Sequence, residues 1–449
     1  MRNEHAITRT AAALVLLTLP MLVACRQAPL AAEKATAVSA ASLDEAGEGP
    51  LRYRFAREPG KTRGGYPLPL SGEVMATSPV VVKQQGVDLK DYPQYYIPGQ
   101  EELAADEMRI SACGSGNPPV RRGQGCTCWL VELGNGDNFI FDVGGGTVPN
   151  LWSLGVPPTR LDKLLLTHLH LDHVGGILTL FDSMGWSRNT PLHVWGSSGH
   201  TPELGTAAFV NHIQKAAAWH TESKRGISPS GVMRAVPHEF DYSLFSPENP
   251  RQLVHDENGV KIYAFPILHI LVGAVGYRLE WNGLSMAFTG DSEPTRQEAE
   301  QAAGVDVFIH EAFITPEAFA KRNSMPLEVA ENIIYKAHTP ADMLGQVFDI
   351  ARPVLGVGTH YFQDDDLIDP FFERIATTYD GPVTLAQDLM VINVTPRQIV
   401  LRMAKTEQLW WAPSDPEAKG GDTLEEGYTS AARTPNWIVA TKIEPGDPN

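Results

Sequence analysis

The segment Thr167–His173 constrains the fold of this chain more than any other, because it places three histidines and an aspartate in one short loop. Its sequence, THLHLDH, follows directly on the strand-like run Lys163–Thr167. Imidazole nitrogens and carboxylate oxygens are ligands that zinc prefers, and a short loop after a strand lets neighbouring side chains point at different ions. The motif therefore predicts a metal-binding loop at the end of a β-strand.

Further polar residues each stand where an apolar strand ends. His269 closes KIYAFPIL, Asp291 closes SMAFTG, Glu311 closes VFIH and His360 closes VLGVGT. A strand interior favours none of these residue types, whereas the ends of neighbouring strands meet at one rim, where rigid backbone holds ligands beside a cleft. We therefore expect these side chains to lie next to the histidine-rich loop.

The remaining pattern predicts the fold class. The pairs Asn135-Gly136 and Asn282-Gly283 are typical of tight hairpin turns. The strand-like runs are Thr127–Leu133, Asn138–Val143, Lys163–Thr167, Lys261–Leu268, Gly276–Trp281, Leu284–Thr289, Val305–Ile309, Val354–Gly358 and Val383–Val394. Helical patterns cover Gly176–Met184, Thr295–Ala303 and Pro340–Ile350. Hairpins mixed with helices predict an α+β fold, in which two mixed β-sheets form an αββα sandwich flanked by helices.

The first residues indicate an export signal. Arg2 and Arg9 precede the apolar run Ala11–Ala24, which is too short to span a bilayer. The run ends in LVAC, which resembles the lipobox of bacterial lipoproteins, so residues 1–25 are expected to be a signal peptide that leaves a lipid on Cys25. The residue that follows, Arg26, favours the periplasmic face of the outer membrane by the same resemblance. An ordinary signal peptide with a chance cysteine is the alternative.

Composition divides the rest of the chain. Residues 26–50 are rich in Ala, Glu and Ser and are expected to be a disordered tether, followed by an irregular extension over 51–105. The main domain is expected over 106–405, with an insertion at about 186–258 that either caps the active site or is a surface elaboration. The tail, 406–449, is expected to be pinned by Trp410, Trp411 and Trp437.

Charge and cysteine content exclude some classes of protein. The formal net charge of −17 argues against a surface that neutralises a phosphate backbone, so no nucleic-acid partner is expected. Cys113, Cys126 and Cys128 are odd in number and cannot all pair in an oxidising compartment. They are interpreted as buried small apolar residues, with a disulfide from Cys113 as the other option.

The ordered motifs HLHLDH, His269, FTGDS around Asp291 and TH at His360 resemble those of the metallo-β-lactamase superfamily. Within it, the chain is most similar to the ribonuclease Z branch over about residues 106 to 400. The branch is indicated by GSGNPPVRRGQ, FIFDVGGGT, GYRLEW, HEA, HT at His338 and QDLMVINV. The N-terminal extension, including IPGQEELAADEMRIS, resembles that of exported relatives labelled guanitoxin-biosynthesis-type metallohydrolases.

The resemblance implies a site for two Zn²⁺ ions, with Mn²⁺ or Fe²⁺ as alternatives. One ion would be held by His168, His170 and His269, the other by Asp172, His173 and His360, and Asp291 would bridge them. Asp172 would also accept a proton from the shared water, and Glu311 and His338 would assist the leaving group, with His338 as general acid. A pair that caps a helix or supports the ligands is the alternative for Glu311 and His338.

The sequence also departs from ribonuclease Z. Where that branch follows its last histidine with a serine and an arginine that contact phosphate, this chain has Tyr361, Phe362 and Gln363. Asp364–Asp366 come next and are interpreted as a solvated loop, with a third metal site as the alternative. The expected function is therefore hydrolysis of a small ester, first of all a phosphodiester, by attack of a metal-bridging hydroxide. The alternatives are an arylsulfate ester, a lactone or β-lactam, single-iron redox or sulfur chemistry, and a lipoprotein without catalysis. A homodimer stays open.

Overall fold

The computed structural model describes residues 80–184, 190–224, 234–407, 415 and 435–442, together with short strands at 52–53, 62–63 and 66–67. These residues belong to the unit Gly47–Asn449. The predicted signal peptide with Cys25, the tether, and Trp410 and Trp411 of the tail lie outside the described residues. Among the helices that are described, none is long and apolar enough to cross a membrane.

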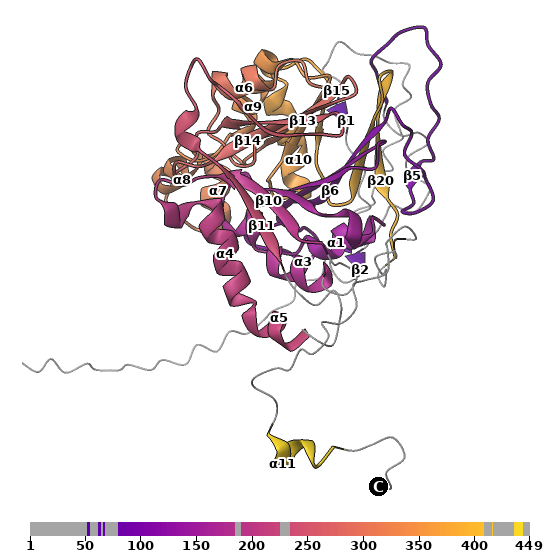
Figure 1. The fold of residues 1–449 in the computed structure, drawn as a ribbon. Coiled ribbons are helices and arrows are strands. Elements are labelled where there is room, and N and C mark those ends of the chain that lie inside the picture. The colour runs from indigo at the N-terminus through magenta and orange to yellow at the C-terminus, as the bar shows by residue number, and fades with distance from the viewer. Residues whose placement is uncertain are drawn as a thin grey trace, which may run out of the picture. The chain divides into compact units, whose positions relative to one another are not determined.

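Two sheets face each other across the main core (Figure 1). The first has eight strands, in the order β1 (Arg52–Tyr53), β18 (Val383–Leu385), β17 (Leu355–Thr359), β16 (Val307–Glu311), β15 (Leu284–Phe288), β14 (Val275–Trp281), β13 (Val260–Pro266) and β12 (Gln252–Glu257). The second runs β11 (Ala235–Phe240), β10 (Leu192–Ser197), β9 (Lys163–Leu165), β8 (Asn138–Phe141), β7 (Thr127–Leu133), β6 (Met108–Ser115), β19 (Met390–Val394), β20 (Gln398–Ala404) and β4 (Val80–Val82), with β5 (Tyr95–Tyr96) also paired to β20. A separate hairpin joins β2 (Thr62–Arg63) and β3 (Tyr66–Pro67).

Helices cover the outer face of each sheet, which completes the predicted αββα order (Figure 1). On the eight-stranded side lie α6 (Arg296–Gln301), α7 (Pro316–Asn323), α8 (Leu327–Tyr335), α9 (Ala341–Ala351) and α10 (Asp365–Ile375). On the other side lie α1 (Val148–Ser153), α2 (Leu171–Val174), α3 (Ile177–Met184), α4 (Thr206–Ala216) and α5 (Ala218–Lys224). A short α11 (Asn436–Val439) and three 3₁₀ turns, Pro158–Arg160, Pro202–Leu204 and Tyr242–Leu244, complete the described elements.

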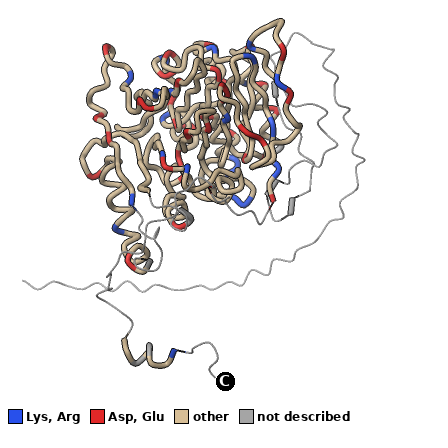
Figure 2. The backbone as a smooth tube through the Cα atoms, turned by 45° about the vertical axis from the view of Figure 1, so that its right-hand side comes forward, with Lys and Arg blue, Asp and Glu red and all other residues tan. Residues whose placement is uncertain are grey.

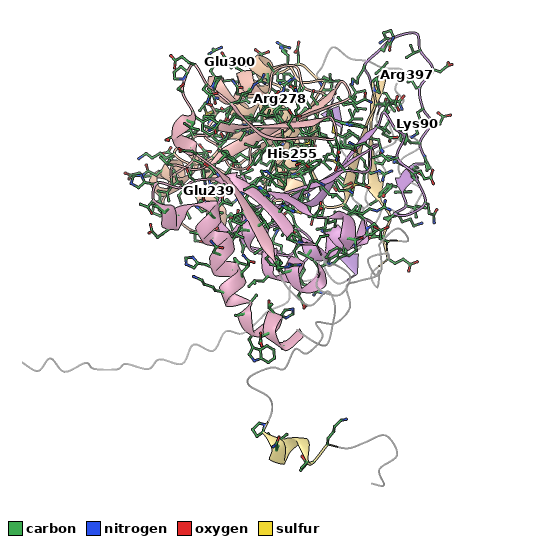
Figure 3. The ribbon with its side chains drawn as sticks, viewed as in Figure 1. Lys90, Glu239, His255, Arg278, Glu300 and Arg397 are labelled. Atoms are coloured by element: carbon green, nitrogen blue, oxygen red, sulfur yellow. The ribbon has the colours of Figure 1, made fainter. Side chains whose placement is uncertain are left out.

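Contacts between the sheets and onto the helices explain why these layers stay together. His255 on β12, labelled in Figure 3, is buried. Its ring packs edge-on against Phe139 and Trp195 of the other sheet. Arg278 on β14 donates through Nη1 to the carbonyls of Gln301 and Ala303 at the end of α6 (Figure 3). Aromatic rings dominate the energy of such cores because each buries a large apolar area.

The α+β sandwich and most strand positions are as predicted, but the run Val383–Val394 is not one strand. It splits into β18 and β19, which belong to different sheets. Between them Asp388 is buried, and Leu389 has a φ of 67°, in the left-handed region that ends a strand. The apolar composition of the run concealed this crossing from one sheet to the other.

Two segments predicted as additions to the domain instead extend its sheets. The extension 51–105, expected to be irregular, supplies β1 to one sheet and β4 and β5 to the other. The insertion 186–258 supplies β10 and β11 to one sheet and β12 to the other. Within the described part of the insertion, α4 and α5 are the α-helices that stand outside the sheets.

The three cysteines are buried, as the first interpretation of the sequence has them. Cys113, Cys126 and Cys128 are buried free thiols. Burial raises the pKa of Cys126 to about 12 and that of Cys113 well above its usual value. Both thiols are therefore protonated at neutral pH and act as small apolar side chains.

Candidate metal centre

The strand ends meet at one rim, as the sequence predicts. β13, β15, β16 and β17 of the eight-stranded sheet all run toward this rim, because β15 to β17 are parallel and β13 is related to β15 through two antiparallel pairings. His269, Asp291, Glu311 and His360 stand at or just after these strand ends. The loop Thr167–His173 follows β9 of the other sheet. Both sheets therefore contribute to the centre.

Three histidines form the first ligand group. His168 Nε2 lies 2.9 Å from His170 Nδ1, and His269 Nε2 lies 3.2 Å from the same atom. Asp291 completes the group, with Oδ2 at 3.9 Å from both His168 Nε2 and His269 Nε2. Each donor of the group lies within 4.8 Å of every other, which is the spacing of ligands around one cation.

The second ligand group uses the other oxygen of the same aspartate. Asp291 Oδ1 lies 3.0 Å from His173 Nε2 and 3.1 Å from His360 Nε2. Asp172 Oδ2 lies 3.1 Å from His360 Nε2 and 3.5 Å from His173 Nε2. All seven predicted ligands therefore converge, and Asp291 stands between two groups with one carboxylate oxygen facing each.

Two buried atoms test whether these residues fit a metal ion. His173 Nε2 and Asp291 Oδ1 are only 3.0 Å apart, yet neither makes a hydrogen bond. Buried polar atoms almost always have a partner, so a pair that is close but not aligned for a proton indicates two donors directed at a common cation. The donor set, nitrogen and carboxylate oxygen, fits zinc and related divalent ions.

Neighbouring charges shift the pKa values of the candidate ligands in opposite directions. Burial lowers the pKa of His173, but the neighbouring carboxylates, led by Asp291, outweigh it and hold that pKa well above the usual value. The same balance raises the pKa of His360 to about 10. For His168, burial dominates and holds the pKa well below its usual value. Protons and metal ions therefore compete mainly at His173 and His360.

The buried Asp142 orients His173, and sequence reasoning gave it no functional role. It follows β8 and accepts hydrogen bonds from His173 Nδ1 at 2.8 Å, from the backbone N–H of Thr167 at 2.8 Å and from the Thr167 hydroxyl at 2.7 Å. A carboxylate on the far nitrogen fixes the tautomer that leaves Nε2 free for a metal. The signal was present in the sequence, because Asp142 closes the apolar strand FIF.

His338 and Glu311 form the predicted pair at the same rim. His338 Nδ1 lies 2.9 Å from Glu311 Oε2, and Phe313 stacks on the imidazole at 4.3 Å between ring centroids. Burial lowers the pKa of His338, but the Glu311 carboxylate raises it above the usual value. The same carboxylate lies 3.3 Å from His360 Nδ1, so Glu311 links the pair to the second ligand group.

Other buried contacts hold the ligand loops. His269 Nδ1 lies 2.7 Å from the carbonyl of Ala337, which joins the first group to the end of α8. Asp388, in the crossing between β18 and β19, accepts from the backbone and hydroxyl of Ser115, and the Ser115 carbonyl accepts from the backbone N–H of His360. His360 has a φ of 60°, a strained conformation for this residue that such contacts must maintain.

The segment Asp364–Asp366, predicted to be a solvated loop, begins with an aspartate that is held by ion pairs. Asp364 is ion-paired with both Arg121 and Arg322, and both guanidiniums lie over the ring of Phe362. The side chains of Asp365 and Asp366 lie outside the described residues.

Comparisons with known proteins find similar sequences. Residues 121–185 match the model of the metallo-beta-lactamase superfamily. The chain is 28% identical to the ribonuclease Z of Mycobacterium avium over 208 residues, 45% of this chain and 69% of that protein. It is 25% identical to the ribonuclease Z of Mycolicibacterium gilvum over 306 residues, 65% of this chain and 96% of that protein.

Solved structures resemble the chain as well. The short form of human tRNase Z is 20% identical, with a TM-score of 0.48 over 63% of this chain and 98% of that chain. The metallo-beta-lactamase fold protein YhfI from Bacillus subtilis is 17% identical, with a TM-score of 0.47 over 64% of this chain and 100% of that chain.

The αββα sandwich, the match of residues 121–185 to the metallo-beta-lactamase superfamily model and the rim of histidines and aspartates support a metallo-hydrolase of the metallo-β-lactamase fold. Within that superfamily, the curated proteins that the chain matches are ribonucleases Z, at 25–28% identity for the two given above.

Proposed function

We propose that the protein is a dinuclear zinc hydrolase of a small ester, first of all a phosphodiester. The observation that carries the proposal is Asp291, whose two oxygens face two separate ligand groups. Two divalent ions held at such a site lower the pKa of a water and stabilise the attacking and leaving oxygens of an in-line displacement. The ions would be held by His168, His170 and His269, and by Asp172, His173 and His360.

The chain's own residues would position the ester and move protons. Asp172 has a second carboxylate oxygen beyond the one near His360 and His173, and it would accept the proton of the attacking water. His338 gives Nδ1 to Glu311, which leaves Nε2 as the nitrogen that would protonate the leaving oxygen. Phe313 and Glu311 keep the imidazole in one orientation for that transfer.

Small esters are favoured over nucleic acid by the charge of the chain. The formal net charge is −17, and basic positions lie interspersed with acidic ones over the described chain (Figure 2). Nucleic-acid binding draws on many lysines and arginines gathered on one face. In addition, this chain follows its last histidine with Tyr361, Phe362 and Gln363, where the ribonuclease Z branch has a serine and an arginine that contact phosphate.

The proposed location is the periplasmic face of the outer membrane, with a lipid on Cys25 as the membrane anchor. The motif LVAC at Leu22–Cys25 supports it. Metabolic labelling with a radioactive fatty acid tests this part: label that enters the wild type and is lost in Cys25→Ser supports the lipid anchor, and equal label in both contradicts it.

The test of the activity measures metal and substrate together. Purified protein should contain about two zinc ions per chain by elemental analysis, and it should cleave bis(p-nitrophenyl) phosphate faster than p-nitrophenyl sulfate or an aliphatic lactone. A faster sulfate reaction would move the substrate to arylsulfate esters, and a single iron would indicate redox chemistry.

A matched pair of variants separates this activity from a contaminant. Asp172→Ala should abolish diester cleavage, whereas Asp256→Ala, at an exposed position on β12, should leave it unchanged. Cleavage that survives in Asp172→Ala would contradict the mechanism.

A further inference from the structure

Large apolar side chains are exposed beside the ligands of the first metal group. Leu171, between His170 and Asp172, is 78% exposed. The four apolar neighbours of His269 are also exposed, at 53% for Leu268, 62% for Ile270, 65% for Leu271 and 51% for Val272. We call these five residues the apolar rim. Single exposed leucines are ordinary on protein surfaces, but a contiguous apolar group at a functional site indicates a ligand or a partner.

The two parts of the apolar rim lie together because their ligands do. His170 Nδ1 and His269 Nε2 are 3.2 Å apart, so the segment around Leu171 and the hairpin loop 267–274 flank the same ligand group. A molecule bound at this group would therefore lie beside the rim. From Phe265 to Tyr277 the chain has no Asp, Glu, Lys or Arg, so the loop offers no charge to a polar ligand.

Backbone hydrogen bonds hold the hairpin loop in place, although its apolar side chains are exposed. Ile267 N donates to the Ala274 carbonyl at 3.0 Å, and Glu293 N donates to the Leu268 carbonyl at 2.8 Å. His269 Nδ1 is tied to Ala337 at 2.7 Å. The backbone of Ile270 has a φ of 27°, which is unfavourable for a β-branched residue. A strained and exposed isoleucine beside a metal ligand indicates that its side chain has a function.

We propose that the apolar rim binds an alkyl or aryl substituent of the substrate, so that the preferred ester carries one negative charge and one sizeable apolar group. This inference rests on the proposed function for the reaction, and it adds the class of substrate. A second charged group would find no basic partner on the loop, whereas an apolar group would cover leucine and isoleucine side chains that water now contacts. Removing that apolar area from water favours binding.

Binding of phosphonates to the zinc-loaded protein tests the rim without requiring turnover. Calorimetric titration with the O-methyl monoesters of methyl-, butyl- and octylphosphonic acid, which carry one negative charge each, tests the length of the apolar group. The Kd should fall about 2-fold for each added CH₂, which is half of the free energy behind the about 4-fold expected for complete burial. The double variant Ile270→Asn/Leu271→Asn should lose most of this dependence on chain length. Asparagine tolerates the backbone of residue 270, so folding is retained.

A control pair and a second variant keep the test decisive. Leu244→Asn/Leu253→Asn changes two leucines of similar exposure, 56% and 49%, that do not adjoin a ligand, and it should keep the wild-type dependence. Leu171→Asn probes the rim from the other segment and should weaken binding of the octyl compound about 10-fold, the lower end of what one lost contact in an apolar site changes.

The outcomes distinguish this inference from the proposed function. If the protein cleaves the diester but the Kd does not depend on chain length, the inference about the apolar rim is wrong and the proposed hydrolase activity still holds. If the Kd depends on chain length but the protein does not cleave the diester, the apolar rim is supported and the proposed reaction is wrong. Should the rim variants instead abolish self-association in sedimentation, or binding to phosphatidylglycerol vesicles, with the phosphonate series unchanged, the occupant is a second copy or a membrane and the inference is wrong.

Discussion

Replacement of Asp142 by asparagine tests whether the centre depends on one tautomer of His173. In the wild type, Asp142 accepts from three donors, the His173 ring and the backbone and hydroxyl of Thr167. An amide has the same shape but offers one accepting oxygen and an NH₂ group. Whichever way it is turned, its NH₂ faces an N–H, either of His173 Nδ1 or of Thr167. The first arrangement favours moving the ring proton to Nε2, which is the proposed ligand atom.

The expected cost follows from the kind of contact that is lost. Loss of a hydrogen-bonded partner behind a ligating histidine weakens metal affinity by about 10- to 100-fold, which is about 1.4 to 2.7 kcal/mol. The affinity of Asp142→Asn for the second equivalent of zinc should therefore be lower by this factor. Its affinity for the first equivalent, at His168, His170 and His269, should change less. Competition against a chromophoric chelator, read over two equivalents, measures both affinities.

A matched control separates this effect from general loss of stability. Asp306 is also a buried aspartate and accepts from the backbone N–H of Ser285, but it precedes β16 and so lies at the opposite end of that strand from Glu311. Asp306→Asn should leave both zinc affinities unchanged. Equal weakening in the two variants, or none in Asp142→Asn, would refute the reasoning about the tautomer.

Three further predictions concern folding. In Gly144→Ala the new Cβ would lie 2.0 Å from the backbone oxygen of Asp172, so the free energy of unfolding in urea should fall by about 1 to 3 kcal/mol. Burial lowers the pKa of His310, but Glu298 raises it above 6.5. The stabilisation from this pair is therefore present below pH 6.5 and is lost as the pH rises through the folded pKa, so Glu298→Gln should destabilise the metal-free protein more at pH 6 than at pH 9. Zinc at about 100 times its Kd should add about 2.7 kcal/mol to the free energy of unfolding, and a chelator should remove that gain in calorimetry.

The sequence located the candidate site well because one local rule covers it. A polar residue that ends an apolar strand has little structural reason to be there, and the rule brought His269, Asp291 and His360 to the rim where the structure has them. The same rule applies to Asp142, but composition cannot tell a ligand from the residue that orients a ligand. That distinction depends on distances of a few tenths of an ångström between side chains.

The parts of the fold that were mispredicted are those with little local signal. Strands of two or three residues, such as β1, β4 and β5, are too short to show periodicity, and pairing with a longer strand decides their conformation. The crossing at Asp388 is hidden inside an apolar run, because its buried carboxylate is stabilised by Ser115, more than 250 residues away in the sequence. His338 follows helix α8, outside the strand-end rule, and was predicted from family resemblance alone.

The centre draws its donors from loops of both sheets, since the segment His168–His173 follows β9 and His269, Asp291 and His360 follow strands of the opposite sheet. Bound cations would therefore cross-link the two sheets at this rim. Without metal, the loops at this rim would separate first, and the protein's resistance to proteases would then depend on the zinc concentration around it.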